Sequence, residues 1–282
     1  MKIDFHVHIT PPDIIANREK YAKKEPYFAM LANSKHNKFA TAEEVVSAIE
    51  RDGIVDRAVV FGFAFRDLGL CRYVNDYVIE KTKQFPEKLT GFLVVPPGGK
   101  ETAKEIERCF NAGLKGVGEL FPEGQRLALD DPKKTRSITD ACKELALPLL
   151  LHANEPVGHY YPGKTTVPLK HLETFITNNP DLKIILAHFG GGIFLYEAMN
   201  EIKEKFRNVY YDTAAAPFLY DAKIYRAAKA LRLCEKILFG TDFPLLPPSR
   251  YLPAIEESGL SDDEKQQILG ANAQKLLIKN IL

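Results

Sequence analysis

Short apolar segments alternate with amphipathic helical segments along most of the chain, and this repeat limits the possible folds more than any other feature. Each strand-like segment is followed by a helical pattern. The strand-like segments span residues 2–9, 57–63, 89–97, 114–121, 148–154, 183–192, 208–215 and 236–244. Most are continuous apolar runs, which indicates parallel strands that are buried on both faces.

Eight repeats of strand and helix close naturally into a (β/α)₈ barrel. We therefore expect an α/β TIM barrel that forms a single domain over residues 1–282. The alternative is an open doubly wound sheet, which typically has fewer strands and a glycine-rich nucleotide turn. Only "FGGG" at 189–192 resembles such a turn, and it lacks the GxGxxG spacing. The pattern favours the barrel.

Residues 10–40 interrupt the repeat with a long connection rich in Lys, Tyr, Phe and Pro. Connections of this length in compact domains are usually functional loops or carry short helices of their own. Because the segment follows the first strand, we expect it to lie over the mouth of the barrel as a lid or a subunit contact. A homo-oligomer is therefore left open, and the alternative is an insertion without a function.

The net charge and the cysteine pattern indicate which partners and which cellular compartment to expect. The 38 basic and 37 acidic residues give a net charge of +1, so no strong field is available to attract nucleic acid or an anionic membrane. The four cysteines form no CxxC pair, which fits a reducing compartment. The N-terminus has no secretory pattern, and no apolar run is long enough to span a bilayer. We expect a cytoplasmic protein without nucleic-acid or membrane partners.

Titratable residues concentrate where the predicted strands end. Alternation along the first strand points His6 and His8 to one face, so the pair can bind one ion. Further strand ends carry Glu119, His152, His188, Asp212 and Asp242. In a TIM barrel these ends meet at the active-site mouth.

Each of these residues also has a structural interpretation: a histidine bonded in the core, Glu119 in a buried ion pair, or Asp242 as a helix cap. Burying so many titratable groups without a partner would cost several kcal/mol each. Imidazole and carboxylate are natural ligands of divalent metals, so the set predicts a metal centre. We expect zinc most, with manganese or iron as alternatives.

The segments "DFHVH", "LLHAN", "LAHFGG" and "GTDFP", with "ILGANAQKLL" near the end, resemble the amidohydrolase superfamily. The similarity is greatest to the amidohydrolase-related branch that contains aminocarboxymuconate-semialdehyde decarboxylase-like enzymes, and it covers essentially the whole chain. The resemblance implies that His6, His8, His152 and Asp242 bind metal. It also implies that His188 binds a second ion or contacts the attacking water or the substrate.

The fourth strand departs from many two-metal members, which carry a carboxylated lysine where this chain has Glu119. "GVGELF" is similar instead to the corresponding strand of TatD-like hydrolases, whose glutamate is a metal ligand. Glu119 is therefore a candidate ligand, and the resemblance leaves the number of ions at one or two.

Four functions follow from such a centre. The first is hydrolysis of an amide, ester or lactone-like bond in a small molecule, because a bound metal lowers the pKa of water toward ~7 and Asp242 can accept its proton. His188 would polarise the substrate or orient the water. The alternative is decarboxylation of a small aromatic or unsaturated acid. A TatD-like phosphodiesterase is disfavoured by the neutral charge, and a non-catalytic binding barrel is disfavoured because no ligand is missing.

Candidate substrate contacts lie on the loops that follow the strands. Arg66 can bind a carboxylate through both ends of its guanidinium, although a solvated loop position fits it equally. Phenylalanines and tyrosines of these loops can line an apolar pocket, although packing accounts for most of them. The candidates are Arg66, Phe63, Phe65, Phe121, Asn154, His159, Tyr160 and Tyr161. His36 and His171 are expected on the surface or in a helix.

Overall fold

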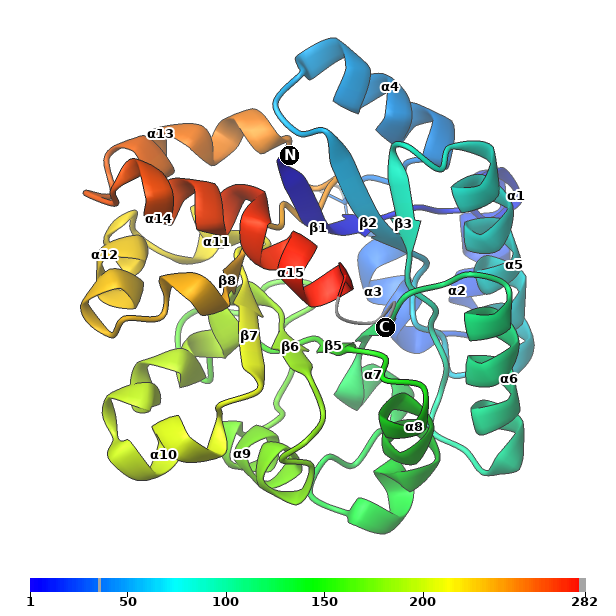
Figure 1. Ribbon diagram of the computed structural model, residues 1–282. Coiled ribbons are helices and arrows are strands. Elements are labelled where there is room, and N and C mark those ends of the chain that lie inside the picture. Colours follow the sequence, from blue (N-terminus) through cyan, green and yellow to red (C-terminus); the bar gives the residue numbers. More distant parts are fainter. Residues whose placement is uncertain (35–36, 279–282) are drawn as a thin grey trace.

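The computed structural model describes residues 1–34 and 37–278, so the expectation for His36 lies outside the described residues. Eight parallel strands lie at the centre of the molecule and helices surround them (Figure 1). The strands are β1 (Ile3–His8), β2 (Arg57–Phe61), β3 (Leu89–Gly91), β4 (Val117–Leu120), β5 (Leu149–Leu151), β6 (Ile184–Leu186), β7 (Val209–Asp212) and β8 (Ile237–Leu238). Their apolar side chains are buried, as the continuous apolar runs predict.

The strands form a three-stranded sheet, β1-β2-β3, and a five-stranded sheet, β4 to β8. Backbone contacts join the two sheets at both seams. Leu93 bridges to Val117, and Val7 bridges to Phe243. At the second seam Phe5 N–H donates to Phe239 O over 2.7 Å, and Asp242 N–H donates to His6 O over 2.9 Å. The ring is therefore continuous, and the (β/α)₈ barrel is confirmed.

Amphipathic helices cover the outside of the barrel. They are α4 (Ala42–Asp52), α5 (Leu68–Gln84), α6 (Lys100–Asn111), α8 (Pro132–Glu144), α9 (Leu169–Asn178), α10 (Asn200–Lys205), α12 (Lys223–Ala230), α13 (Leu252–Glu256), α14 (Asp262–Gln266) and α15 (Asn272–Ile278). Thr41 begins α4 with a capping box to Glu44, as its sequence predicts. Cys109 of α6 and Cys142 of α8 are buried in the core beside apolar neighbours, as expected.

Two predicted helices differ from the structure. The pattern "GIFLYEAMNEIKEKF" predicts one continuous helix over 192–206, but the structure has a 3₁₀ segment at His188–Ala198 followed by α10. Residues 188–192 all have positive φ, so the glycine run makes a left-handed turn before any helix begins. The pattern "SDDEKQQILGANAQKLL" predicts a C-terminal helix over 261–277, but a π-helical turn at Gln267–Ala271 divides it into α14 and α15.

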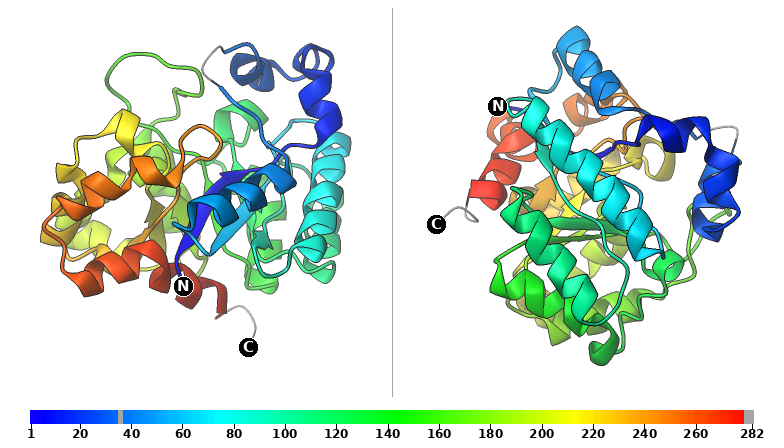
Figure 2. Two further views of the ribbon diagram at one scale, coloured as in Figure 1. Left: turned by 90° about the horizontal axis from the view of Figure 1, so that it is seen from above. Right: turned by 90° about the vertical axis from the view of Figure 1, so that its right-hand side faces the viewer.

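The 10–40 segment contains three short helices, α1 (Pro12–Ala16), α2 (Arg18–Ala22) and α3 (Pro26–Ala32). Its ends are joined, because Thr10 N–H donates to Ala40 O over 2.8 Å. The segment rises at the end of the barrel opposite the N-terminus, and the loop over 155–165 rises at the same end (Figure 2). Both therefore stand at the mouth, where the strand ends meet. α7 (Pro122–Gln125) and α11 (Ala216–Leu219) are short helices that directly follow β4 and β7.

Candidate metal centre

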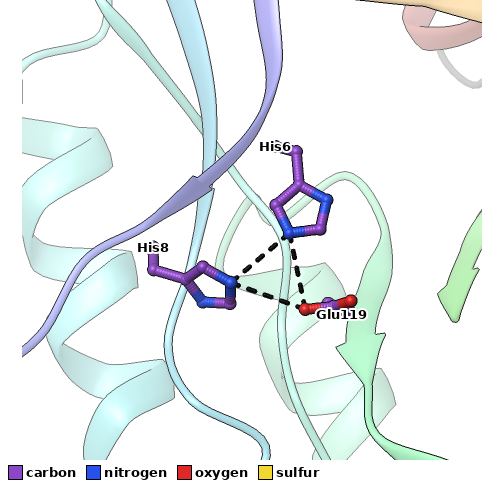
Figure 3. A group of neighbouring side chains, drawn as sticks. All are labelled: His6, His8 and Glu119. Carbon is purple, nitrogen blue, oxygen red and sulfur yellow. Dashed lines mark hydrogen bonds and ion pairs between the residues drawn. The ribbon is translucent and has the colours of Figure 1, made fainter. Parts of the chain in front are cut away.

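The two histidines of β1 meet the glutamate of β4 at the mouth of the barrel. The Nε2 atoms of His6 and His8 lie 3.3 Å apart. Each of these nitrogens lies 3.4 Å from Oε2 of Glu119, so the three side chains converge on one point (Figure 3). This convergence confirms the prediction that β1 points both imidazoles to one face.

Asp242 extends this group from the end of β8. Its Oδ1 lies 3.3 Å from His8 Nε2 and 3.7 Å from His6 Nε2. Ligand bonds of 2.0–2.2 Å around a tetrahedral ion place neighbouring donor atoms about 3.3–3.6 Å apart. The facing nitrogen and oxygen atoms of His6, His8 and Glu119 therefore have the spacing of a divalent-metal site, and Asp242 lies beside them. We call these four residues the first donor group.

Glu119 also faces a second donor group, made of His152 and His188. Its Oε1 lies 2.9 Å from His152 Nδ1 and 3.7 Å from His188 Nε2. His152 is 8% exposed, and its buried Nε2 has no hydrogen-bond partner among the described residues. The four ligands that the resemblance implies are thus divided: His6, His8 and Asp242 lie on one side of Glu119, and His152 lies on the other.

The charged side chains of the site shift the pKa values of their neighbours in the direction opposite to the shift that burial causes. Burial lowers the pKa of His6, but the carboxylates of Asp212 and Glu119 outweigh it and raise that pKa well above its usual value. Burial raises the pKa of Glu119, and the imidazoles of His6 and His152 reverse this to hold it well below its usual range. For Asp242 the hydrogen bond from His8 and the charge of His6 outweigh burial and lower the pKa to about 2.

His188 behaves in the same way. Burial lowers its pKa, but the adjacent Glu119 carboxylate raises it to about 9. The carboxylates of the site thus favour a positive charge on the imidazoles of His6 and His188. A divalent cation would supply a positive charge to the same carboxylates, and the donor set fits such an ion.

Two further carboxylates hold the donors in place. Asp212, at the end of β7, accepts a hydrogen bond from His6 Nδ1 over 2.8 Å. Asp4 accepts from His6 N–H over 3.2 Å and from Thr241 N–H over 3.0 Å, which ties β1 to the residue before Asp242. Asp212 is predicted from the sequence to lie at a strand end, but no role is predicted for it. Asp4 is not among the candidates predicted from the sequence. The available signal for Asp4 was its alternation with His6 and His8 on β1.

Two of the candidate substrate residues, Phe121 and Phe63, pack against the rings of other residues. The Phe121 ring lies 4.3 Å from the His152 ring and 5.4 Å from the ring of Tyr27 on α3. Phe63 packs against Phe28, also of α3, at 5.3 Å. Phe121 therefore borders the second donor group, whereas Phe63 secures the 10–40 segment.

Arg66 lies between that segment and α7. Its Nε–H donates to Gly124 O, and its guanidinium lies 5.5 Å from the centre of the Tyr27 ring. The Glu25 carboxylate accepts the backbone N–H groups of Arg66 and Asp67. The backbone and one side of the guanidinium are thus held by neighbours. The role of Arg66 in substrate binding stays a prediction.

Asn154 closes the loop over 155–165. Its Oδ1 accepts from Thr165 N–H over 2.8 Å, and its Nδ2 donates to Thr165 O over 3.1 Å. Inside the loop, Lys164 donates to the carbonyl oxygens of Val157 and His159. Of the substrate candidates on this loop, Asn154 is buried and shapes it. His159 and Tyr160 are exposed, and Tyr161 donates to Glu155 over 3.2 Å.

His171 lies on α9, partly exposed and 3.7 Å from Asp130, away from the donor groups as expected. Among the residues that the structure describes, no helix has the length and apolar character needed to cross a membrane.

The family model described as amidohydrolase matches residues 3–278, so the chain belongs to the amidohydrolase family. Among curated proteins, 2-amino-3-carboxymuconate-6-semialdehyde decarboxylase of Dictyostelium discoideum is 24% identical, over 98% of this chain and 91% of the relative. Gamma-resorcylate decarboxylase of Polaromonas sp. is 26% identical, over 74% and 76%. These similarities identify the chain as a member of an enzyme family.

Among solved structures, the 5-carboxyvanillate decarboxylase of Novosphingobium aromaticivorans superposes with a TM-score of 0.79. The two chains are 16% identical over 99% of this chain and 96% of the other, so this likeness concerns the fold. That structure contains manganese and 4-hydroxy-3-methoxy-5-nitrobenzoic acid. The donor groups of this chain themselves support a divalent metal, without identifying it as zinc. Both curated relatives carry the names of decarboxylases, which agrees better with the alternative reaction than with the hydrolysis expected first.

Proposed function

We propose that this protein is a metal-dependent decarboxylase of a small aromatic or unsaturated carboxylic acid. One observation carries the proposal: an alignment over nearly the whole length of a curated decarboxylase, in a chain whose strand ends form a buried metal-type donor group. The second curated relative is also a decarboxylase. The similarity supports the reaction class, and the donor groups support its metal dependence.

His6, His8, Asp242 and Glu119 would hold the cation, with His152 and His188 on the second oxygen of Glu119. Manganese and zinc both accept imidazole and carboxylate ligands. When bound, the cation supplies a Lewis acid that anchors the substrate oxygens and withdraws electron density from the bond to be broken.

Decarboxylation breaks the bond between carbon and the carboxylate and leaves the electron pair on carbon, which then takes a proton. The acid becomes carbon dioxide and a C–H bond, without oxidation or reduction. Asp242 of the first donor group and His188 of the second are the two candidates to deliver that proton. The Phe121 ring offers a flat apolar contact for an unsaturated substrate, and Arg66 would bind a second anionic group on it.

A second candidate is hydrolysis, which Glu119 favours. Its two oxygens face two separate donor groups, and paired metal sites are common in enzymes that hydrolyse esters and amides. In that reaction Asp242 would take a proton from water. The number of bound ions, one or two, bears on the choice between these reactions. Elemental analysis of protein purified without chelator counts the ions directly.

The test is to follow the fate of the carboxylate and of water with one panel of substrates. Aromatic carboxylic acids, lactones, amides and esters are incubated in ¹⁸O-labelled water, with carbon dioxide measured alongside. Carbon dioxide release, without label in the organic product, supports decarboxylation. Label in the product without carbon dioxide overturns it in favour of hydrolysis. A cytoplasmic location, a homo-oligomer and the absence of a nucleic-acid partner stay predictions.

A further inference from the structure

Asp212 contacts both donor groups although it belongs to neither. Its side chain is fully buried at the end of β7, and both carboxylate oxygens are used. Oδ2 accepts from His6 Nδ1 over 2.8 Å. Oδ1 accepts the backbone N–H of His188 over 2.9 Å and that of Ala214 over 3.0 Å. One carboxylate therefore connects a histidine of the first donor group with a histidine of the second.

The contact with His6 determines which of its nitrogens faces the donor group. A carboxylate only accepts hydrogen bonds, so His6 Nδ1 must carry the proton that Asp212 receives. In the neutral ring the lone pair is then on Nε2, the atom that lies 3.4 Å from Glu119 and 3.3 Å from His8 Nε2. A metal ligand needs this arrangement, because it binds through an unprotonated nitrogen.

The contact with His188 acts through the backbone. His188 has φ of 58°, a left-handed conformation that is strained for a residue other than glycine. Asp212 holds its N–H, and Tyr220 donates to its carbonyl oxygen over 3.3 Å. The ring donates from Nδ1 to Ala214 O over 2.8 Å, and Ala214 is itself held by Asp212. His188 Nε2 is consequently the nitrogen directed at Glu119.

We propose that Asp212 is a positioning residue that directs Nε2 of both His6 and His188 toward the donor groups, so that the lone pair of each neutral ring faces a cation, and that Asp212 thereby sets the affinity of the donor groups for a divalent cation. The inference rests on the cation binding in the proposed function, but it applies equally to decarboxylation and hydrolysis. Its test uses the metal alone, so it can fail while the reaction assignment stands, and the reverse.

An asparagine at this position breaks the arrangement in a predictable way. Its amide has one accepting oxygen and one donating NH₂ group. If the oxygen keeps the two backbone N–H groups, the NH₂ group faces His6 Nδ1. His6 must then accept at Nδ1 and carry its proton on Nε2, which occupies the lone pair that a cation needs.

The experiment compares D212N with E197Q, a matched control. Glu197 is also a buried carboxylate, and it accepts from Tyr211, the neighbour of Asp212 on β7, over 2.7 Å and from Lys236 over 2.6 Å. E197Q should lose stability without a change in cation affinity. D212N should bind Mn²⁺ and Zn²⁺ about 10–100-fold more weakly by calorimetry, the usual effect of losing a partner of a metal ligand.

Nitrogen-15 NMR of the metal-free proteins, recorded where the ring is neutral, supplies a readout independent of activity. In the wild type, His6 should carry its proton on Nδ1, and in D212N on Nε2. Should D212N fail to fold, the wild-type spectrum still decides, because a proton on His6 Nε2 there overturns the proposal. Unchanged cation affinity in folded D212N, or an equal loss in E197Q, also overturns it.

Discussion

The donor groups at the strand ends and the loops above them are built by different means. His6 is 0% exposed, and its ring and its backbone are each bonded to a different strand or strand end. The loop over 155–165 is held mainly from within, by Asn154 at its base and by Lys164 at its centre. The donor groups are thus fixed to the strands of the barrel, whereas the loop can change without disturbing them.

The largest effect that this comparison predicts is at Asp242. The change Asp242→Asn keeps the size but removes the charge and the capacity to move a proton. Catalysis should fall by about 10²–10⁴, the usual contribution of a positioned acid–base group, with the thermal midpoint nearly unchanged. Initial rates on the best substrate of the panel measure this. Asp221→Asn, on an exposed site before α12, is the control and should behave like the wild type.

Glu119→Gln should have the next largest effect. Each oxygen of Glu119 faces one donor group, so the amide weakens both. Cation affinity should fall at least about 10-fold while the barrel stays folded. Elemental analysis and calorimetry measure it, with Glu105→Gln, a buried carboxylate on α6, as the control. Full metal occupancy together with a lower melting temperature would instead assign Glu119 a purely structural role.

Gly191→Ala probes the place where the two regions meet. Gly191 has φ of 61°, and a Cβ there would lie 2.2 Å from Asn154 O, at the base of the loop. Gly192 has φ of 90° with nothing within 4 Å of such a Cβ. Both alanine variants incur backbone strain of about 1–3 kcal/mol, but only Gly191→Ala should also displace His188. Equal losses of stability and of cation affinity in the two variants would contradict this.

We expect the smallest effect from a substitution in the loop over 155–165. Lys164→Met removes the ammonium that binds two carbonyl oxygens and lies beside Glu155. We expect about 1 kcal/mol of lost stability, unchanged cation affinity and faster hydrogen exchange confined to 155–165. Lys170→Met, at an exposed position on α9 beside Glu173, is the control. Weaker cation binding in Lys164→Met would show that the loop and the donor groups are coupled after all.

The same contrast explains what the sequence predicts well. His6, His8, Glu119, His188 and Asp242 converge because strand alternation and barrel topology place every strand end at one mouth. These are regular properties of a repeating pattern, so they follow from the order of residues along the chain.

The rest depends on contacts between distant residues. That His152 faces the second oxygen of Glu119, and that Asp212 links His6 to His188, follow from side-chain directions across several strands. The prediction of a helix over 192–206 is wrong because it gave more weight to the apolar pattern of 193–198 than to the three glycines that precede this pattern. The loop contacts of Asn154 and Lys164 have no periodicity from which to infer them.

The closure of the barrel through β1 and the end of β8 has a consequence for synthesis. Asp4 and Thr241 are 237 residues apart in sequence, and their contact adjoins the donors His6 and Asp242. Synthesis therefore produces His6 and His8 long before Asp242, the carboxylate that completes the first donor group. Such long-range closure slows folding, and the complete first donor group cannot help to organise the early barrel. A cation that requires all four donors of this group could therefore bind only after β8 has closed the barrel.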